Sequence, residues 1–471
     1  MNAVYHFQQS TENQRTKEMG RYTMKVTIQP GRIVGEIAAI PSKSHLHRLL
    51  IYAAFANEPT LISCRETEAE DIRATIDCLA ALGTIIVREK DGFRVTPVNR
   101  EKMPLGTDKP VLFPCGESGS TLRFMLPVVC ALGIRGAFEM KGRLPERPLA
   151  PLDAELEKNG IRLWRDTPEK GEASDLRSER LCEPPTCVGL FCEGKLQAGV
   201  YSLPGNISSQ YISGILMAMA LTDEQCRLIV TEPIESAGYI EMTLNAAETF
   251  GQKIAVTKTS QGFEYDIGGA LKSPARAETE GDWSNGAFWL CAGAMPGGNI
   301  KLSGLLKDSS QGDREIFDIL HRMGADIKYE ATTISATEKL RRATEIDAGA
   351  IPDLIPVLAA VAAVSEGTTV VTNAARLRIK ESDRLMAVAQ TLSALGADIT
   401  ETADGLIISG KPTLTGGIID AHGDHRIAMT AAIASAACTA PVTINGAQAV
   451  NKSYPQFWND LQLLGTTIEF S

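Results

Sequence analysis

Cationic and hydroxyl side chains recur where apolar, alanine-rich helices are expected to begin. Lys43 and Ser44 open the segment KSHLHRLLIYAAFA, and the i, i+4 spacing places Ser44 and Arg48 on one helix face. The segment GESGSTLR brings glycines and hydroxyls before Arg123, and Ser208-Ser209-Gln210 open a third such helix. Lysine or arginine at a helix N-terminus opposes the helix dipole, so stability alone would not place it there. If these helix starts converge, they form an anion-binding region; taken singly, each start is explained by simple N-capping by serine or aspartate.

The second half of the chain adds carboxylates to the same pattern. Asp353 precedes an apolar helix, the run 376–384 reads RLRIKESDR, and the sixth apolar helix opens with Asp-His-Arg at 424–426. A solvated helix face would by itself explain the charged run. The histidines are too few and too scattered to predict a metal centre.

Internal repeats describe the elements that must position these side chains. Six segments share the order amphipathic helix, glycine, β-rich run, and the glycine suits the left-handed residue that closes a helix. These glycines are Gly83, Gly160, Gly251, Gly324, Gly396 and Gly465. Six apolar helices alternate with them, so we expect six copies of a unit with two helices and several strands. The charged segment at about 165–188 lengthens one interval and is typical of an inserted surface loop.

Composition narrows the class of protein. Of 471 residues, 44% are hydrophobic and 22% charged, which excludes a disordered chain. A net charge of −10 argues against a generally basic nucleic-acid surface, and the longest apolar run, 354–364, is too short to span a bilayer. Ten cysteines without a C-x-x-C motif predict a reducing, cytoplasmic location. Cys182, Cys187 and Cys192 recur every five residues, an unusual spacing for a metal site. Residues 1–23 lack an apolar core and are expected to be a disordered tail rather than a secretory signal.

Eleven short motifs together resemble the family of 5-enolpyruvylshikimate-3-phosphate synthases. They run in family order from residue 24 to 471: PSKSHLHR, GESGSTLR, LPERP, SSQY, ESAGYIEMT, EGDWSNGA, SSQGDRE, IPDLIP, RIKESDRL, GDHRIAM and NKSYP. The resemblance implies a two-domain inside-out α/β barrel with three βαβαββ repeats in each domain. It places residues 42–279 in one domain and residues 24–41 plus 280–471 in the other.

The resemblance also implies a reaction. The family transfers the enolpyruvyl group of phosphoenolpyruvate to the 5-hydroxyl of shikimate 3-phosphate by addition and elimination, and releases phosphate. This step leads toward chorismate and the aromatic amino acids and uses no metal or organic cofactor. The expected partners are these two small molecules, with no nucleic acid or membrane, and the expected state is a monomer.

Site residues follow from the matching motif positions. Those implied for shikimate 3-phosphate are Lys43, Ser44, Arg48, Ser208, Ser209, Gln210, Ser236, Asp353 and Lys380. Those implied for phosphoenolpyruvate are Lys43, Gly119, Arg123, Arg147, Gln210, Arg384, Arg426 and Lys452. Asp353 is the expected base, Glu381 the expected proton donor to carbon, and Lys43 and Lys452 are expected to stabilise charge as C–O bonds form and break.

The chain departs from the family pattern at three places. It lacks the glycine that many members carry before the serine of PSKS, it reads GESGS where some read GNAGT, and Arg376 aligns with a ligand-contacting asparagine of some members. Two alternatives remain open. The sister enzyme acting on UDP-N-acetylglucosamine has Lys-Asn where this chain has Lys43-Ser44, and a loop cysteine where Cys115 precedes a different motif. A non-catalytic anion-binding repeat protein would need the cations but neither Asp353 nor Glu381.

Overall fold

The computed structural model describes residues 23–65, 69–106, 109–166, 188–222 and 225–471. The predicted tail, apart from residue 23, and most of the predicted insertion, with Cys182 and Cys187, lie outside the described residues. The described cysteines are free thiols. Within the described ranges, none of the helices has the length and apolar character needed to cross a membrane.

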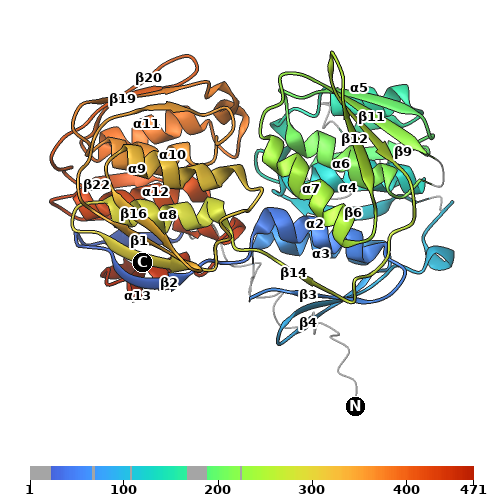
Figure 1. Ribbon diagram of the computed structural model, residues 1–471, viewed down its shortest axis with the longest axis horizontal. Helices are drawn as coiled ribbons and strands as arrows, with labels where there is room; N and C mark the ends of the chain where they lie inside the picture. Colours follow the sequence, from blue (N-terminus) through green and yellow to red (C-terminus); the bar gives the residue numbers. More distant parts are fainter. Residues whose placement is uncertain (1–22, 66–68, 107–108, 167–187, 223–224) are drawn as a thin grey trace, which may run out of the picture.

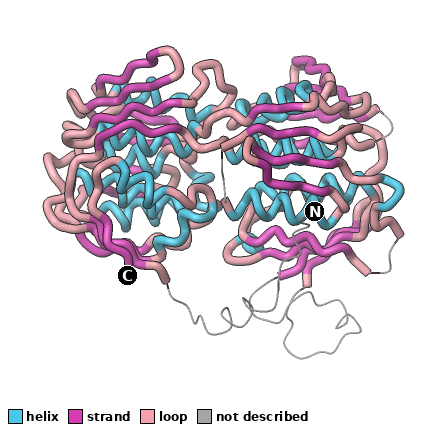
Figure 2. Tube along the Cα trace, turned by 90° about the horizontal axis from the view of Figure 1, so that it is seen from below, coloured by secondary structure: helices cyan, strands magenta, loops and turns pink. Residues whose placement is uncertain are grey.

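The chain folds into two lobes, which Figure 1 shows side by side. The strands of the described residues form six four-stranded sheets, three in each lobe. In each sheet one edge strand pairs in parallel with its neighbour and the other two pairs are antiparallel, as in β10-β11-β13-β12, where β10 and β11 are parallel. Figure 2 shows these sheets on the outside of each lobe with helices between them. The predicted α/β fold with six related units is confirmed.

One lobe contains three units, and the first takes its outer strand from a later part of the chain. The elements of this lobe are β14 (Arg276–Glu278), α2 (Lys43–Ala54), β3 (Thr60–Ser63), α3 (Glu70–Ala81), β4 (Ile85–Glu89), β5 (Gly92–Thr96); β6 (Val111–Gly116), α4 (Gly119–Leu132), β7 (Gly136–Met140), α5 (Leu152–Lys158), β8 (Arg162–Arg165), β9 (Val188–Glu193); β10 (Val200–Pro204), α6 (Ser209–Met219), β11 (Cys226–Thr231), α7 (Ala237–Thr249), β12 (Ile254–Lys258) and β13 (Gly262–Ile267).

The other lobe also contains three units, and two of them each include a strand from the start of the chain. Its elements are β2 (Val34–Ala38), α8 (Trp283–Ala294), β15 (Asn299–Ser303), α9 (Ile316–Arg322), β16 (Asp326–Glu330), β17 (Thr333–Thr337); β18 (Glu345–Asp347), α10 (Ile355–Ala362), β19 (Thr368–Thr372), α11 (Arg384–Ala394), β20 (Asp398–Glu401), β21 (Leu406–Ser409); β22 (Gly417–Asp420), α12 (His425–Ala434), β23 (Val442–Asn445), α13 (Phe457–Leu463), β24 (Ile468–Phe470) and β1 (Lys25–Ile28).

The two helices of each unit differ in burial, as their sequences predict. Every residue of α8 and of α10 is buried, which fits helices that are apolar on all faces. The more amphipathic helices end at the six predicted glycines, each of which has a positive φ between 76° and 97°. The prediction that glycine closes these helices in the left-handed region is therefore confirmed.

The chain crosses between the lobes twice, and the two crossing segments lie side by side. Pro41 and Gly281 form an antiparallel bridge. Ser42 N donates to Glu280 O at 2.8 Å, and Asp282 N donates to Ile40 O at 2.9 Å. One hydrophobic core contains buried residues from 26–39 and 283–468, and a second contains buried residues from 46–277. Each lobe therefore has its own core, and the chain passes between the lobes at this hydrogen-bonded pair of segments.

Candidate active site

The starts of the six buried helices converge on one cavity between the lobes. Five of the helices have a side-chain cap: the N-cap residues Ser42, Ser118, Ser208, Asp282 and Asp424 accept a backbone N–H of the first turn. The sixth, α10, begins beside Asp353. Simple capping and convergence therefore occur together, and the dipoles of several helices favour negative charge at one place.

The cavity has a volume of about 90 Å³ and is lined by both lobes. Twelve of the sixteen predicted site residues line it: Lys43, Ser44, Arg48, Gly119, Arg147, Ser209, Gln210, Ser236, Asp353, Glu381, Arg384 and Arg426.

The other four predicted residues lie behind or beside this lining. Ser208 caps α6. Arg123 Nη1 donates to Gln210 Oε1 at 2.8 Å, and Lys380 Nζ lies 3.4 Å from Asp353 Oδ1. The Lys452 ammonium pairs with the Glu117 carboxylate of the other lobe. All four therefore contact a lining residue or the loop next to one.

Arg384 joins three carboxylates at the floor of the cavity. Its guanidinium lies 2.6 Å from Asp353 Oδ1, 2.7 Å from Glu381 Oε2 and 2.8 Å from Asp424 Oδ2, and only 1% of the side chain is exposed. Burial opposes the charge on Arg384, but the three carboxylates raise its pKa. The run 376–384 is not one solvated helix: a 3₁₀ turn, Ala375–Ile379, leads into a loop, and Asp383 caps α11.

Asp353 and Glu381 are held in the ionised form. Burial acts to raise the pKa of Asp353, but Arg426, Lys380 and Arg384 together hold it well below its usual range. Burial likewise acts against ionised Glu381, and Arg384 and Arg147 hold its pKa well below its usual range. Both carboxylates can therefore accept a proton only after some of this positive charge is engaged elsewhere.

Two guanidinium groups lie together on the opposite wall, where, of the carboxylates that the structure describes, Glu381 alone pairs with one of them. A Cβ at Gly119 would come within 2.7 Å of Nη1 of both Arg123 and Arg147, so the two side chains approach this wall because residue 119 is glycine. Burial, and secondly the charge of Arg147, lower the pKa of Arg123 to about 10. The Nε atoms of both are buried and have no hydrogen-bond partner among the described residues. Arg147 Nη1 reaches Glu381 Oε1 across the lobes at 3.3 Å. This wall is suited to an anion with several oxygens.

Arg48 is more strongly engaged by the protein than the sequence suggests. Its Nε donates to Thr243 Oγ1 at 2.8 Å and its Nη1 to Ser44 O at 2.6 Å. Its Nη2 donates to Ser213 Oγ at 3.1 Å and Tyr239 O at 3.0 Å. Arg48 therefore supports the cavity wall as well as lining it.

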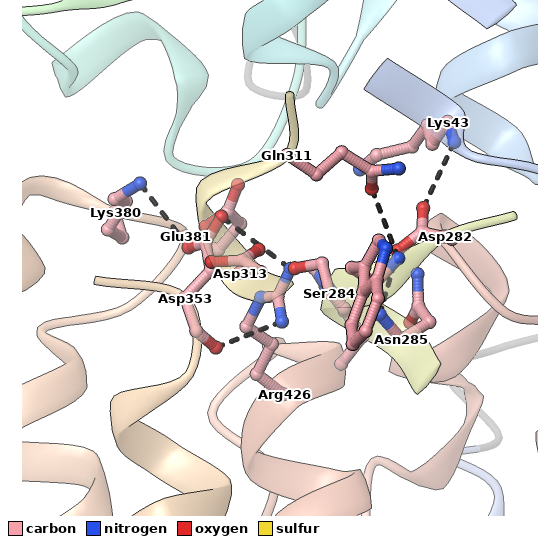
Figure 3. Close-up of polar contacts among 12 residues, drawn as sticks. Lys43, Asp282, Ser284, Asn285, Gln311, Asp313, Asp353, Lys380, Glu381 and Arg426 are labelled. Carbon is pink, nitrogen blue, oxygen red and sulfur yellow. Dashed lines mark hydrogen bonds and ion pairs between the residues drawn. The ribbon is translucent and has the colours of Figure 1, made fainter. Parts of the chain in front are cut away.

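Sequence reasoning missed several lining residues that Figure 3 partly shows. Asp71 accepts from Lys43 Nζ at 2.5 Å, and Asp282 Oδ2 accepts from Lys43 N at 3.0 Å. Asp282 had a signal, its N-cap position in EGDWSNGA. Asp71 had none, because acidic residues are ordinary in a first helical turn. The remaining missed lining residues are Ser120, Phe124, Tyr239, Ser284, Asn285 and His425.

Comparisons with known proteins agree with this geometry. Residues 28–461 match the family model described as EPSP synthase (3-phosphoshikimate 1-carboxyvinyltransferase). A 3-phosphoshikimate 1-carboxyvinyltransferase from Clostridium novyi is 38% identical over 452 residues, covering 94% of this chain and 98% of that protein. One from Clostridium perfringens is 40% identical over 443 residues, covering 94% and 98%.

Solved structures show the same fold. An EPSP synthase from Acinetobacter baumannii superposes with a TM-score of 0.73 at 25% identity, covering 95% of this chain and 100% of that one. The enolpyruvyl transferase NikO from Streptomyces tendae superposes with a TM-score of 0.71 at 18% identity, covering 95% and 99%, and supports the fold alone.

Fold and cavity together define a two-lobed α/β protein whose cationic, carboxylate-containing cavity lies between the lobes. The family match and the relatives narrow this class of protein to one family. The chain belongs to the EPSP synthase family.

Proposed function

We propose that the cavity between the lobes is the active site of this chain. The chain transfers the enolpyruvyl group of phosphoenolpyruvate to shikimate 3-phosphate, a step of the shikimate pathway. The observation that supports the location is the gathering of cations from both lobes around two ionised carboxylates. Each substrate has a phosphate and a carboxylate, and such a site can neutralise both.

The cationic wall at Gly119 suits phosphoenolpyruvate. We assign its binding to Lys43, Gly119, Arg123, Arg147, Gln210, Arg384, Arg426 and Lys452. The Arg123 and Arg147 guanidinium groups supply donors in a planar fork, and Gly119 keeps the space beside them free of a side chain.

The hydroxyl-rich wall between α2, α6 and α7 suits shikimate 3-phosphate. We assign its binding to Lys43, Ser44, Arg48, Ser208, Ser209, Gln210, Ser236, Asp353 and Lys380. Hydroxyl and amide groups bind a phosphate or a ring hydroxyl without adding charge to a cavity that already holds several cations.

Substrate binding can activate the two carboxylates. In the reaction, Asp353 accepts the proton of the 5-hydroxyl while the 5-oxygen bonds to C2 of phosphoenolpyruvate. Glu381, which first takes up a proton from water, protonates the methylene carbon to a methyl group. The Glu381 carboxylate then takes a proton back from that methyl group as the C2–O bond to phosphate breaks and phosphate leaves. The substrate anions draw Arg384, Arg426 and Lys380 away from their internal partners, so the pKa of each carboxyl rises toward its usual range. Lys43 and Lys452 stabilise the charge that develops on oxygen.

The sister reaction on UDP-N-acetylglucosamine lacks a matching feature here. Its expected acid is a loop cysteine, whereas Cys115 lies on β6 with 0% exposure in the core of its lobe. A thiol in that place cannot reach a substrate in the cavity.

Phosphate release from phosphoenolpyruvate, measured with and without shikimate 3-phosphate, tests the assignment. Wild-type protein should release phosphate only when both are present. Asp353→Asn should bind shikimate 3-phosphate within about threefold of wild type while turnover falls at least about 10²-fold, as expected for a general base. Wild-type turnover in this variant would refute the base assignment. If the folded wild-type protein released no phosphate, the chain would be a protein that binds anions without catalysing the transfer.

The lobes themselves are proposed as the two domains, 42–279 and 24–41 plus 280–471. Separate cores and one paired connection support movement about that connection. We also propose a cytoplasmic monomer, since one chain supplies the whole cavity lining described above. Size-exclusion chromatography with light scattering tests the monomer.

A further inference from the structure

Asp313 is a buried carboxylate that the proposed chemistry does not use. It lies in the 3₁₀ turn Gly312–Glu315 and is 1% exposed. Figure 3 shows it close to Asp353, Ser284 and Arg426, three residues that line the cavity. A buried carboxylate normally needs a partner that compensates its charge. The groups that contact Asp313 therefore indicate what role it can have.

The first partner of Asp313 comes from the other lobe. Tyr239 Oη, on α7, donates to Asp313 Oδ2 at 3.1 Å. The backbones meet here, because a Cβ on Gly238 would lie 2.1 Å from Ser310 O. The Tyr239 carbonyl also accepts from Arg48. The hydrogen bond between Tyr239 and Asp313 therefore exists only while the lobes are in contact.

The second connection runs from Asp313 to Asp353 through Arg426. Arg426 Nη2 donates to Ser284 Oγ at 2.6 Å, Arg426 Nη1 donates to the backbone oxygen of Asp353 at 3.0 Å, and Nη2 lies 3.6 Å from Asp353 Oδ2. Asp353 Oδ1 is engaged by Arg384 at 2.6 Å and Lys380 at 3.4 Å. Of the two Asp353 carboxylate oxygens, Oδ2 has the longer contact with its cationic partner, so it is the oxygen better placed to accept a proton.

We propose that Asp313 is a positioning residue for the transfer reaction: when Tyr239 reaches it from the other lobe, it keeps Nη2 of Arg426 on Ser284, 3.6 Å from Asp353 Oδ2, so that this oxygen of the base stays available. The proposal rests on the proposed function, since it assumes that Asp353 is the base. In this proposal, the availability of Asp353 in one lobe depends on the contact that Tyr239 of the other lobe makes with Asp313.

The charges around Asp313 agree with such a role. Burial raises the pKa of Asp313 to about 6, repulsion by Asp353 adds to this, and Arg426, Ser284 and Tyr239 act against it. Asp282 also faces Tyr239, while Glu381, Lys380 and Arg384 face Asp353. Removing the charge of Asp313 removes a repulsion and lets Arg426 move onto Asp353, and both changes lower the pKa of Asp353.

The test compares Asp313→Asn with wild type in steady-state turnover across pH. Asparagine keeps an acceptor for Tyr239 and removes only the charge. We expect kcat to fall about 10-fold, KM for each substrate to stay within about threefold, and the acidic limb of the kcat profile to move to lower pH. A purely structural role would lower the melting temperature without moving that limb.

Tyr239→Phe provides a second variant that keeps the size of the side chain. Its kcat should fall, and the Tyr239→Phe, Asp313→Asn double variant should be no slower than Asp313→Asn, because both act through one contact. If Asp313→Asn does not fold, Tyr239→Phe tests the proposal by itself: a lower kcat with the acidic limb moved to lower pH supports it, and wild-type values of both overturn it. Matched controls are Tyr201→Phe, which loses a hydrogen bond to Gln197 O within one lobe, and Asp460→Asn, which alters an acceptor of Tyr454. Both should keep wild-type kcat.

The outcomes separate the two proposals. Wild-type kcat and an unmoved limb in the folded variants, with Asp353→Asn inactive, would overturn the role of Asp313 alone. Full activity of Asp353→Asn would overturn the base assignment, and the role of Asp313 with it.

Discussion

Replacing Arg384 with alanine should destabilise the folded protein as well as abolish turnover. The guanidinium is 1% exposed and lies within 2.8 Å of three carboxylates, of which Asp424 is fully buried. Removing one partner of a buried ion pair costs about 3–5 kcal/mol, because the other charge is left uncompensated. Asp353 and Glu381 are 24% and 20% exposed, so water compensates them in part and Asp424 accounts for most of the cost. We therefore expect the free energy of unfolding to fall by about 3–5 kcal/mol near neutral pH.

The pH dependence distinguishes this explanation from simple loss of packing. In wild type, cations including Arg384 lower the pKa values of Asp353, Glu381 and Asp424 against the effect of burial. These groups therefore stabilise the fold above their unfolded pKa, and that stability is lost as pH falls through their folded pKa. Without Arg384 these pKa values rise, and for Asp424, which is fully buried and loses its main cationic partner, ionisation then opposes folding at neutral pH. The difference between Arg384→Ala and wild type should shrink as pH falls toward about 4.

Denaturant unfolding followed by tryptophan fluorescence measures this difference at about pH 7.5 and about pH 5. Trp283 and Trp289 are buried in the lobe that contains Arg384 and report its unfolding. Lys301→Ala, which breaks an exposed pair with Glu36, is the control and should show no measurable change. Equal destabilisation of Arg384→Ala at both pH values would refute the electrostatic explanation.

Two further predictions concern pairs that cross between the lobes. Burial acts to lower the pKa of Lys452, but the Glu117 carboxylate raises it, so Glu117→Gln should lower that pKa. The alkaline limb of the pH profile of kcat/KM for phosphoenolpyruvate should then move to lower pH. An unmoved limb would exclude coupling between Glu117 and Lys452. Arg376 Nη1 lies 2.5 Å from Glu235 Oε2, so Arg376→Glu should lower kcat/KM for shikimate 3-phosphate roughly fivefold or more, and adding Glu235→Arg should recover part of it. Steady-state kinetics of the single and double variants checks the pair, and a double variant slower than either single variant would contradict it.

Local features of the fold could be predicted because their causes are local. Gly83 and Gly396 close helices with φ values of 97° and 93°, and a left-handed closing residue selects glycine from sequence alone. Ser42 and Asp424 cap α2 and α12 for a similarly local reason. The number of units followed from the repetition of these signals. The placement of β1 and β2 in the later lobe was predicted from the family resemblance and not from periodicity, and the pairing of β14 with β3 was not predicted.

The candidate site was less predictable because its pairs connect distant segments. Motif positions indicated Lys43, but not its contact with Asp71, which depends on how α2 packs against α3. Arg48 was expected to face substrate, yet four of its contacts are internal because Thr243 and Ser213 approach from other helices. The partner of each charge is a property of packing, which no single motif contains.

Internal pairing also explains how an acidic chain maintains a cationic cavity without substrate. Lys43 is paired with Asp71, Arg384 with three carboxylates and Lys452 with Glu117, so each of these cations already has an anionic partner. The cavity of about 90 Å³ is well below the ~300 Å³ at the lower end of ligand pockets, so two substrates cannot enter this arrangement. Under the proposed function, we expect the lobes to separate about the paired segments at Pro41 and Gly281, and the substrate anions then to replace internal carboxylates as partners of the cations. Because the cations would exchange one anion for another, the proposed base Asp353 would lose its cationic partners at the moment when both substrates are bound.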